Sequence, residues 1–207
     1  MSTLTHRAVT LHEILGDPTR LSRFEVVERL HVASSELAQH ASVVAGYVDA
    51  MASMAELSEN ERDAIVNAAW LHDIGKLTLS REALHRAGPL TDAEWIEMRG
   101  HPMRAATYLE RSGRLAPAAL FVRQHHEWHN GAGYPIGLQN AQISLGSRLI
   151  GVADAYDAMT SWRPYRPTLT ESKAITELRN CAGTQFDPQI VDLFIRATDG
   201  LRTGVSR

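Results

Sequence analysis

The sequence contains a single cysteine, Cys181, among its 207 residues. It therefore excludes an internal disulfide and a Cys-x-x-Cys zinc site, and we expect Cys181 to be a small buried residue. No apolar run approaches the roughly 20 residues of a membrane helix. Residues 1–6 lack the basic start and apolar core of a signal peptide. These absences predict a cytoplasmic protein without a membrane segment.

The sequence also lacks a cluster of Lys or Arg, and its net charge is -3. General binding to DNA or RNA polymers needs a basic surface, so we expect a small molecule as the substrate or ligand. Hydrophobic residues make up 44% and charged residues 22%, which is typical of a folded chain. We predict a short amino-terminal arm or lead-in helix over residues 1–20 and one domain over residues 21–207.

Apolar residues recur with helical spacing, whereas strand-like alternation is nearly absent. The fold class is therefore predicted to be all-α. Ser58-x-x-Glu61 and Thr91-x-x-Glu94 fit capping boxes, and Asp187 before Pro188 fits a helix start. The expected helices cover residues 20–30, 34–54, 59–73, 91–110, 115–127, 146–160, 170–180 and 188–197. Residues 128–145 are rich in glycine, and we expect a long functional loop there.

Residues that can bind metal ions recur near the ends of these expected helices. Glu36 and His40 are one helical turn apart and can face one site, although this spacing is common on exposed helices. His72 and Asp73 end an apolar helix, so Asp73 must be paired, protonated or bound to metal. His101 precedes a proline and adds a further ligand of the same kind.

The second half of the chain adds another group of such residues. The adjacent His125 and His126 can both be ligands only near a helix end, which the following loop provides. Asp154 lies in a small, apolar context and is the better ligand, whereas Asp157 is expected to orient a histidine from behind. For each histidine, the alternative is a buried structural role.

This collection of five histidines, two aspartates and a glutamate, without a thiolate, favours Fe or Mn, with Zn, Ni or Co as alternatives. Mg²⁺ alone would not require so many histidines. Two such cations activate a water as hydroxide and neutralise phosphate charge, so we expect two or three divalent metal ions and phosphoester hydrolysis. Lys76 lies beside the predicted site, or it is a solvated cation at a helix end.

The motifs His72-Asp73-Ile74-Gly75-Lys76, His125-His126-Glu127, Gly133-Tyr134-Pro135 and Val152-Ala153-Asp154-Ala155-Tyr156-Asp157 resemble the HD-GYP domain, a subgroup of the HD superfamily. The resemblance runs from Glu36 to Phe194. It implies an HD-type helical bundle with a Gly-rich loop after the His-His pair, and a catalytic domain over residues 21–207. It also implies a metal-dependent phosphodiesterase that hydrolyses cyclic di-GMP to pGpG through a metal-bridging hydroxide, and it leaves further hydrolysis to GMP open.

The resemblance also implies a role for individual residues. One metal would be held by His40, His72, Asp73 and Asp154, a second by Asp73, His101, His125 and His126, and a third with the help of Glu36. Asp73 would be the bridge and, with Lys76, the catalytic pair. Cyclic di-GMP would be contacted by Lys76, Tyr134, Arg163 and Arg166. The loop departs from the common pattern at Trp128, His129, Asn130 and Ala132, which leaves the substrate preference open.

Two other functions remain open from the sequence. The chain could hydrolyse another nucleotide, such as a mixed cyclic dinucleotide or a mononucleotide, with the same metals. Alternatively, it could be a signalling module that binds cyclic di-GMP or a cyclase partner through Gly133-Tyr134-Pro135 without turnover. The oligomeric state is also open, and a homodimer through the amino-terminal helices is one option.

Overall fold

The structure is a computed structural model that describes residues 9–80, 84, 88–162 and 167–204. These residues form helices and no β-strand beyond isolated bridges, so the all-α prediction is confirmed. The helices, in chain order, are α1 (Leu11–Leu15), η1 (Pro18–Arg20), α2 (Arg23–Ala33), α3 (Ser35–Ser53), α4 (Glu59–Leu71), η2 (Ile74–Thr78), α6 (Asp92–Arg99), α7 (His101–Glu110), α8 (Ala116–Gln124), η3 (Asn140–Gln142), α9 (Leu145–Thr160), α10 (Glu171–Asn180) and α11 (Pro188–Gly204).

The predicted start signals have the expected geometry. Ser58 and Thr91 each accept a backbone hydrogen bond from the glutamate three residues later, and that glutamate bonds back to the cap. Asp187 accepts from the backbone of Gln189 at the start of α11. Each cap satisfies backbone N–H groups that have no partner inside the helix, and therefore fixes where the helix begins.

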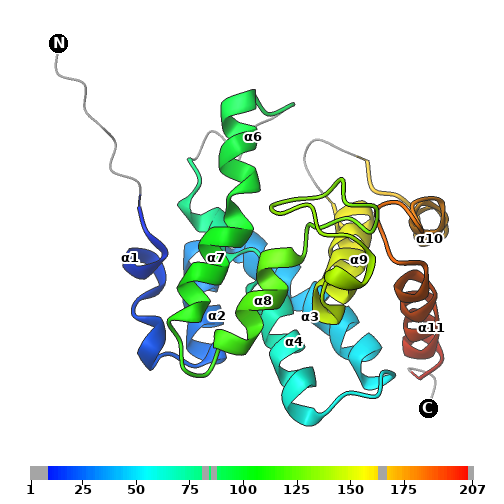
Figure 1. Cartoon of the computed structure of the whole chain (residues 1–207), viewed down its shortest axis with the longest axis horizontal. Coiled ribbons are helices and arrows are strands. Elements are labelled where there is room, and N and C mark those ends of the chain that lie inside the picture. Colours follow the sequence, from blue (N-terminus) through cyan, green and yellow to red (C-terminus); the bar gives the residue numbers. More distant parts are fainter. Residues whose placement is uncertain (1–8, 81–83, 85–87, 163–166, 205–207) are drawn as a thin grey trace.

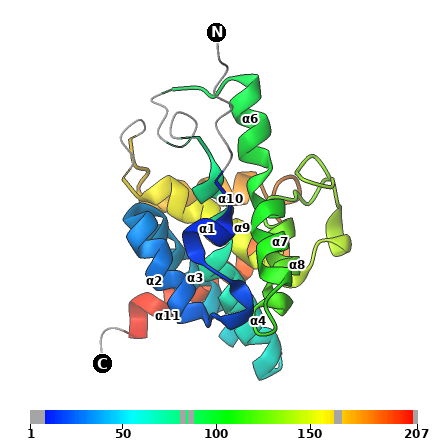
Figure 2. The ribbon, with the colours of Figure 1, turned by 90° about the vertical axis from the view of Figure 1, so that its left-hand side faces the viewer.

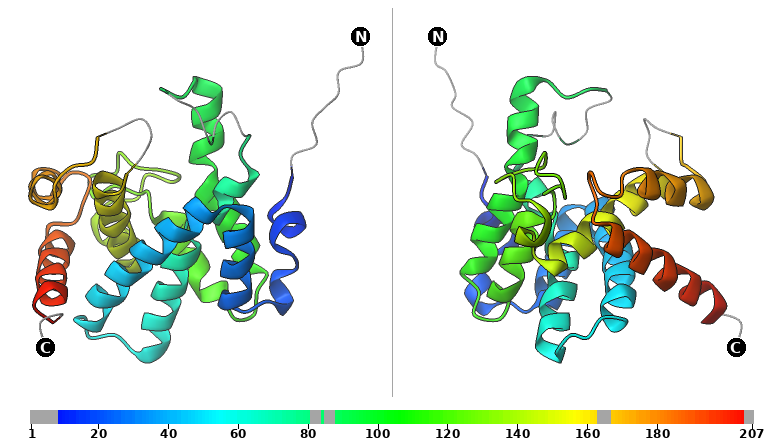
Figure 3. Two further views of the ribbon diagram at one scale, coloured as in Figure 1. Left: turned by 180° about the vertical axis from the view of Figure 1, so that it is seen from behind. Right: turned by 45° about the vertical axis from the view of Figure 1, so that its right-hand side comes forward.

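One hydrophobic core joins most of the helices, whose arrangement is shown in Figure 1. Helix α3 packs against α4 and α9, and α7 packs against α8. Figure 3 shows the same bundle from behind, with α10 and α11 on the side opposite α1 and α2. The core side chains are mostly small or branched, including Val44, Val48, Ile65, Leu71 and Ile150. The ends of the packed helices consequently come close together inside the protein.

The expected single helix over residues 91–110 is wrong: two helices, α6 and α7, meet at Gly100. Pro102 lies in the first turn of α7, where its missing N–H has no consequence, whereas inside a continuous helix it would break the hydrogen-bond ladder. The break makes His101 the first residue of α7. Helix α6 buries no residue and projects from the body (Figure 2).

Further expectations concern the amino-terminal segment, Cys181 and membrane helices. Helix α1 buries Leu11 and Leu15 in the common core, while the predicted boundary at residue 21 stays a prediction. Cys181 is half-buried rather than buried, because it lies at the end of α10 with its thiol directed at Glu177. Within the described part of the chain, no helix is long and apolar enough to cross a membrane.

Candidate metal centre

The end of α4 delivers His72 and Asp73 to the interior. His72 is fully buried and Asp73 is 3% exposed. The chain then turns into η2, which lies directly against the start of α7. A Cβ atom on Gly75 would come within 2.1 Å of the backbone oxygen of His101, so only glycine allows this approach. The glycine of the motif therefore places Asp73 beside His101.

Three buried histidines are oriented in the same local way. The Nδ1 atom of each one bonds to the backbone oxygen three residues earlier, at 2.8 Å for His72, 2.7 Å for His101 and 2.7 Å for His125. A carbonyl oxygen only accepts, so Nδ1 must carry the proton. In the neutral ring, Nε2 then holds the lone pair and points into the site. This is the usual support for a histidine that binds metal through Nε2.

Asp73 lies between two groups of potential ligands, with one carboxylate oxygen directed at each. Its Oδ2 lies 3.6 Å from His40 Nε2 and 3.5 Å from His72 Nε2. Its Oδ1 is buried and lies 3.2 Å from His101 Nε2, without a hydrogen bond because the proton of that ring is on Nδ1. A carboxylate in this position can bridge two cations.

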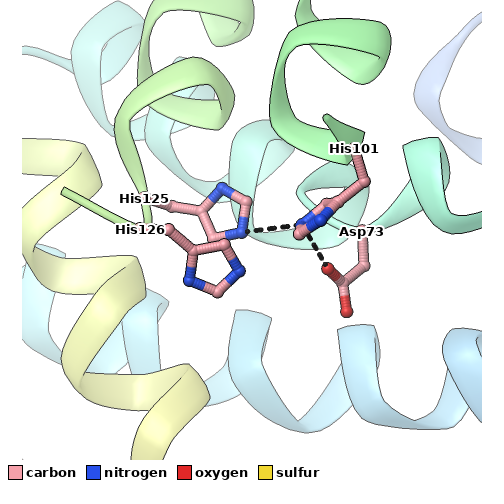
Figure 4. Close-up of side chains that lie close together, drawn as sticks. All are labelled: Asp73, His101, His125 and His126. Atoms are coloured by element: carbon pink, nitrogen blue, oxygen red, sulfur yellow. Dashed lines mark hydrogen bonds and ion pairs between the residues drawn. The ribbon is translucent and has the colours of Figure 1, made fainter. Parts of the chain in front are cut away.

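The second group combines Asp73 with His101, His125 and His126 (Figure 4). One donor atom from each of these four residues lies within 4.8 Å of the others. The Nε2 atoms of His101 and His125 are 3.4 Å apart, and in the neutral rings two lone pairs would face each other. That arrangement is favourable around a cation, so the residues present fit a metal ion.

His40 completes the first group from α3. Its Nδ1 bonds to Asp157 Oδ2 at 2.6 Å, and its Nε2 lies 3.1 Å from Asp154 Oδ1. The structure thus places Asp157 behind His40, in the orienting position expected from the sequence. Glu36 is exposed on the same helix face and lines a cavity of about 290 Å³ together with His40 and Asp73.

Burial and the neighbouring charges determine the protonation states. Burial lowers the pKa of His72 and holds that of His125 well below its usual range, and it lowers the pKa of His126 to about 3. These rings are therefore neutral donors at pH 7. Burial also disfavours a charged His40, but hydrogen bonds to Asp154 and Asp157 outweigh it and raise the His40 pKa to about 10.

The two aspartates remain ionised for a related reason. Burial raises the pKa of each carboxyl, but nearby positive groups reverse this effect. The Lys76 ammonium is the main group that holds the pKa of Asp73 well below its usual range. Hydrogen bonding to His40 lowers the pKa of Asp154. Both carboxylates can therefore serve as anionic ligands over the whole physiological pH range.

Lys76 lines the 290 Å³ cavity and donates to Asp73 Oδ2 at 2.6 Å. Its ammonium lies nearer to the Asp73 carboxylate than the ring of His40 does, at 3.6 Å. The other predicted substrate contacts divide into two cases. Tyr134 packs on the ring of His126, with centroids 4.8 Å apart. Arg163 and Arg166 lie outside the described residues.

Glu127 has a structural role that the sequence did not reveal. Its buried carboxylate accepts hydrogen bonds from the backbone N–H groups of Ile136, Gly137 and Leu138. Gly133 packs so tightly that a Cβ atom would lie 2.2 Å from the backbone nitrogen of Trp128. Glu127 therefore holds the Gly-rich loop against the histidine pair that precedes it. Its partners lie nine to eleven residues ahead, a separation that no local pattern marks.

Comparison with known proteins agrees with this geometry. The HD domain family model matches residues 25–190. The chain belongs to the HD-domain family. The expected resemblance to HD-GYP proteins is confirmed as well. Among solved structures, the HD-GYP protein Bd1817 from Bdellovibrio bacteriovorus superposes with a TM-score of 0.66 at 15% identity, covering 92% of this chain and 68% of that one. At that identity the likeness shows the fold alone.

Curated relatives have names from cyclic dinucleotide signalling. The chain is 31% identical over 95% of its length to 3'3'-cGAMP-specific phosphodiesterase 2 of Vibrio cholerae, and covers 38% of that protein. It is 37% identical over 86% of its length to the cyclic di-GMP phosphodiesterase response regulator RpfG of Xanthomonas campestris, and covers 46% of it. The chain thus spans less than half the length of either relative.

Proposed function

We propose that this HD domain is a metal-dependent phosphodiesterase that opens a cyclic dinucleotide, with cyclic di-GMP as the substrate and pGpG, then GMP, as products. The observation that supports the proposal is the position of Asp73. Its two oxygens face two separate groups of histidine Nε2 atoms, whose directions are fixed by bonds on the far side of each ring. A structural histidine cluster has no need of such convergence.

The two groups would each hold one divalent cation, Fe or Mn by their mixed imidazole and carboxylate donors. His40, His72, Asp73 and Asp154 would form one site, and Asp73, His101, His125 and His126 the other. When bound, such a pair supplies an activated water and positive charge for an in-line displacement at phosphorus. Glu36, at the rim of the cavity beside His40, is positioned to help hold a third ion.

The chain's own residues position the donors and contact the substrate. The buried rings of His72 and His125 present fixed donors and exclude bulk water from the centre. Asp157 keeps the His40 ring in one orientation through a hydrogen bond of 2.6 Å. Lys76, at the wall of the 290 Å³ cavity, offers an ammonium to a phosphate oxygen of the substrate. Tyr134, packed on His126, offers a flat surface beside the reacting phosphate.

A mixed cyclic dinucleotide is the second candidate substrate. The relative that matches 95% of this chain is named as specific for 3'3'-cGAMP, and so is a solved phosphodiesterase of Vibrio cholerae with a TM-score of 0.55 at 30% identity, covering 86% of this chain and 40% of that one. The departures in the loop at Trp128, His129 and Asn130 lie where substrate preference is expected to be set. Both substrates share the phosphodiester chemistry of the proposed site.

The test uses protein loaded separately with Fe(II), Mn, Ni or Co and incubated with cyclic di-GMP or 3'3'-cGAMP. Products are resolved by chromatography, and metal content is measured in the same samples. We expect linear dinucleotide from at least one pair, and neither bound metal nor turnover in Asp73→Ala. Absence of turnover with every metal would contradict the proposal. Unchanged binding of cyclic di-GMP or a cyclase by Asp73→Ala would then favour the signalling module.

Other expectations from the sequence stay predictions. They include a cyclase or other signalling partner at the Gly133-Tyr134-Pro135 loop, a homodimer and a cytoplasmic location.

A further inference from the structure

Arg99 is the last residue of α6 and lies between two aromatic side chains. Its guanidinium carbon is 5.7 Å from the ring centroid of Trp95, one turn earlier, and 5.6 Å from that of Tyr134 in the Gly-rich loop. A guanidinium is attracted to the faces of aromatic rings within about 6 Å. The two rings therefore hold the guanidinium in place, although Arg99 itself is exposed.

The Arg99 guanidinium is held by aromatic rings rather than by an acidic partner from the described residues. Within the described part of the chain, no carboxylate pairs with the Arg99 guanidinium, whereas Arg62, Arg123 and Arg148 each have one. Contacts between a guanidinium and ring faces leave the N–H groups at its edge available. Those N–H groups form a planar fork that matches a carboxylate or a phosphate. A positioned, unpaired fork of this kind is suited to an anionic ligand.

The location of Arg99 connects it to the metal centre. Two residues further on, His101 opens α7 with its Nε2 directed at Asp73. The aromatic partner Tyr134 packs on His126, a member of the second ligand group. Arg99 is itself not among the converging donors, so it lies around the centre rather than within it. Helix α6, which carries it, buries no side chain, and it contacts the centre through the bond from His101 Nδ1 to the backbone oxygen of Met98.

We propose that Arg99 binds the phosphate of the cyclic dinucleotide that is not being cleaved, while the reacting phosphate lies at the metal centre. This inference rests on the proposed function and adds a residue that selects substrates with two phosphates. Trp95 and Tyr134 position the guanidinium, and its edge N–H groups donate to the phosphate oxygens. A substrate with one phosphate gains nothing from this contact.

The experiment compares Arg99→Met, Arg99→Lys and wild type, with Arg114→Met as the matched control on the exposed connection between α7 and α8. Each metal-loaded protein is assayed with cyclic di-GMP and with bis(p-nitrophenyl) phosphate, which has a single phosphate. For Arg99→Met we expect KM for cyclic di-GMP to rise about ten- to hundredfold, as for loss of a hydrogen bond to a charged group. We expect kcat to change less than about threefold, by the same reasoning about ground-state binding.

The remaining results separate the possible roles of Arg99. Arg99→Lys should fall between Arg99→Met and wild type, because it keeps the charge but loses the fork. Hydrolysis of bis(p-nitrophenyl) phosphate, metal content and melting temperature should match wild type in all variants. An unchanged KM for cyclic di-GMP would overturn the inference. So would an equal loss with both substrates, or a loss of metal or of folding, since each shows a structural role.

Failure of the proposed function gives a different pattern. If wild-type protein binds cyclic di-GMP without hydrolysing it, the proposed activity fails, and calorimetric titration of the same variants still tests Arg99. Weaker binding by Arg99→Met than by Arg114→Met would support the contact. Equal binding, or no binding by wild type, would refute it.

Discussion

We expect the protonation of His40 to make metal binding at the proposed site depend strongly on pH. Its pKa is raised to about 10, so at pH 7.5 the ring is an imidazolium with an N–H directed at Asp154 and another at Asp157. A metal can bind Nε2 only after that proton has left. Because the raised pKa favours the charged form below pH 10, metal affinity should increase as the pH rises towards 10.

The size of the effect follows from the difference between the His40 pKa of about 10 and the assay pH of 7.5. Each pKa unit corresponds to about 1.36 kcal/mol, so displacing the proton at pH 7.5 costs about 3.4 kcal/mol, or roughly 300-fold in affinity. Between pH 7 and 9, log affinity at this site should rise by about one unit per pH unit. The other histidines with lowered pKa values are already neutral in this range and add no slope.

Calorimetric titration of chelator-treated protein with Mn²⁺ or Ni²⁺, in buffers of different ionisation enthalpy, counts the protons released. We expect about one proton from His40 at pH 7.5. The comparison variant is Asp157→Asn, which removes one of the three carboxylates that raise the His40 pKa and should make the slope level off at a lower pH. If a metal-bound water also lost a proton, both proteins would release it, and it would cancel in the difference between them. Release of far less than one proton by the wild-type protein at pH 7.5, or a neutral His40 ring at pH 8 by nitrogen NMR, would refute the reasoning.

Three other substitutions test the geometry around the centre. Glu127→Gln replaces a buried carboxylate that accepts hydrogen bonds from the backbone N–H groups of three successive residues, with Gly137 as the middle one. We expect the free energy of unfolding, measured with denaturant, to fall by about 2–3 kcal/mol, and turnover to fall as well. Gly75→Ala places a methyl group against the backbone of His101 and should cost about 1–3 kcal/mol and reduce metal content; full metal occupancy would argue against it. Gly46→Ala, in open space on an exposed face of α3, is the contrasting glycine and should raise stability by about 0.5–1 kcal/mol without changing metal content.

Much of this architecture could be predicted because it is encoded locally. The capping boxes at Ser58 and Thr91 fix two helix starts within four residues of sequence. An aspartate after an apolar helix, as at Asp73, requires compensation wherever the helix packs. The orienting role of Asp157 follows from the general need of metal-binding histidines for a partner on their second nitrogen.

The features that the sequence did not reveal depend on contacts between distant segments. Glu127 binds the far side of its own loop, and Arg99 meets Tyr134 only once α6 and the loop have folded next to each other. The break at Gly100 is a different case. Pro102 signals it locally, and extending the helical periodicity through that proline produced the error.

The local bonding of His72, His101 and His125 has a consequence for how such a domain can diversify. Each ring is aimed by a backbone carbonyl three residues earlier. None relies on the Gly-rich loop for its direction, and His101 relies on α6 only through the main-chain oxygen of Met98. Sequence change in those outer segments can accumulate while the metal donors keep their positions. Libraries randomised at residues 128–132 and along α6 should therefore yield many metal-loaded proteins with altered substrate choice, whereas libraries at the helix ends should yield few.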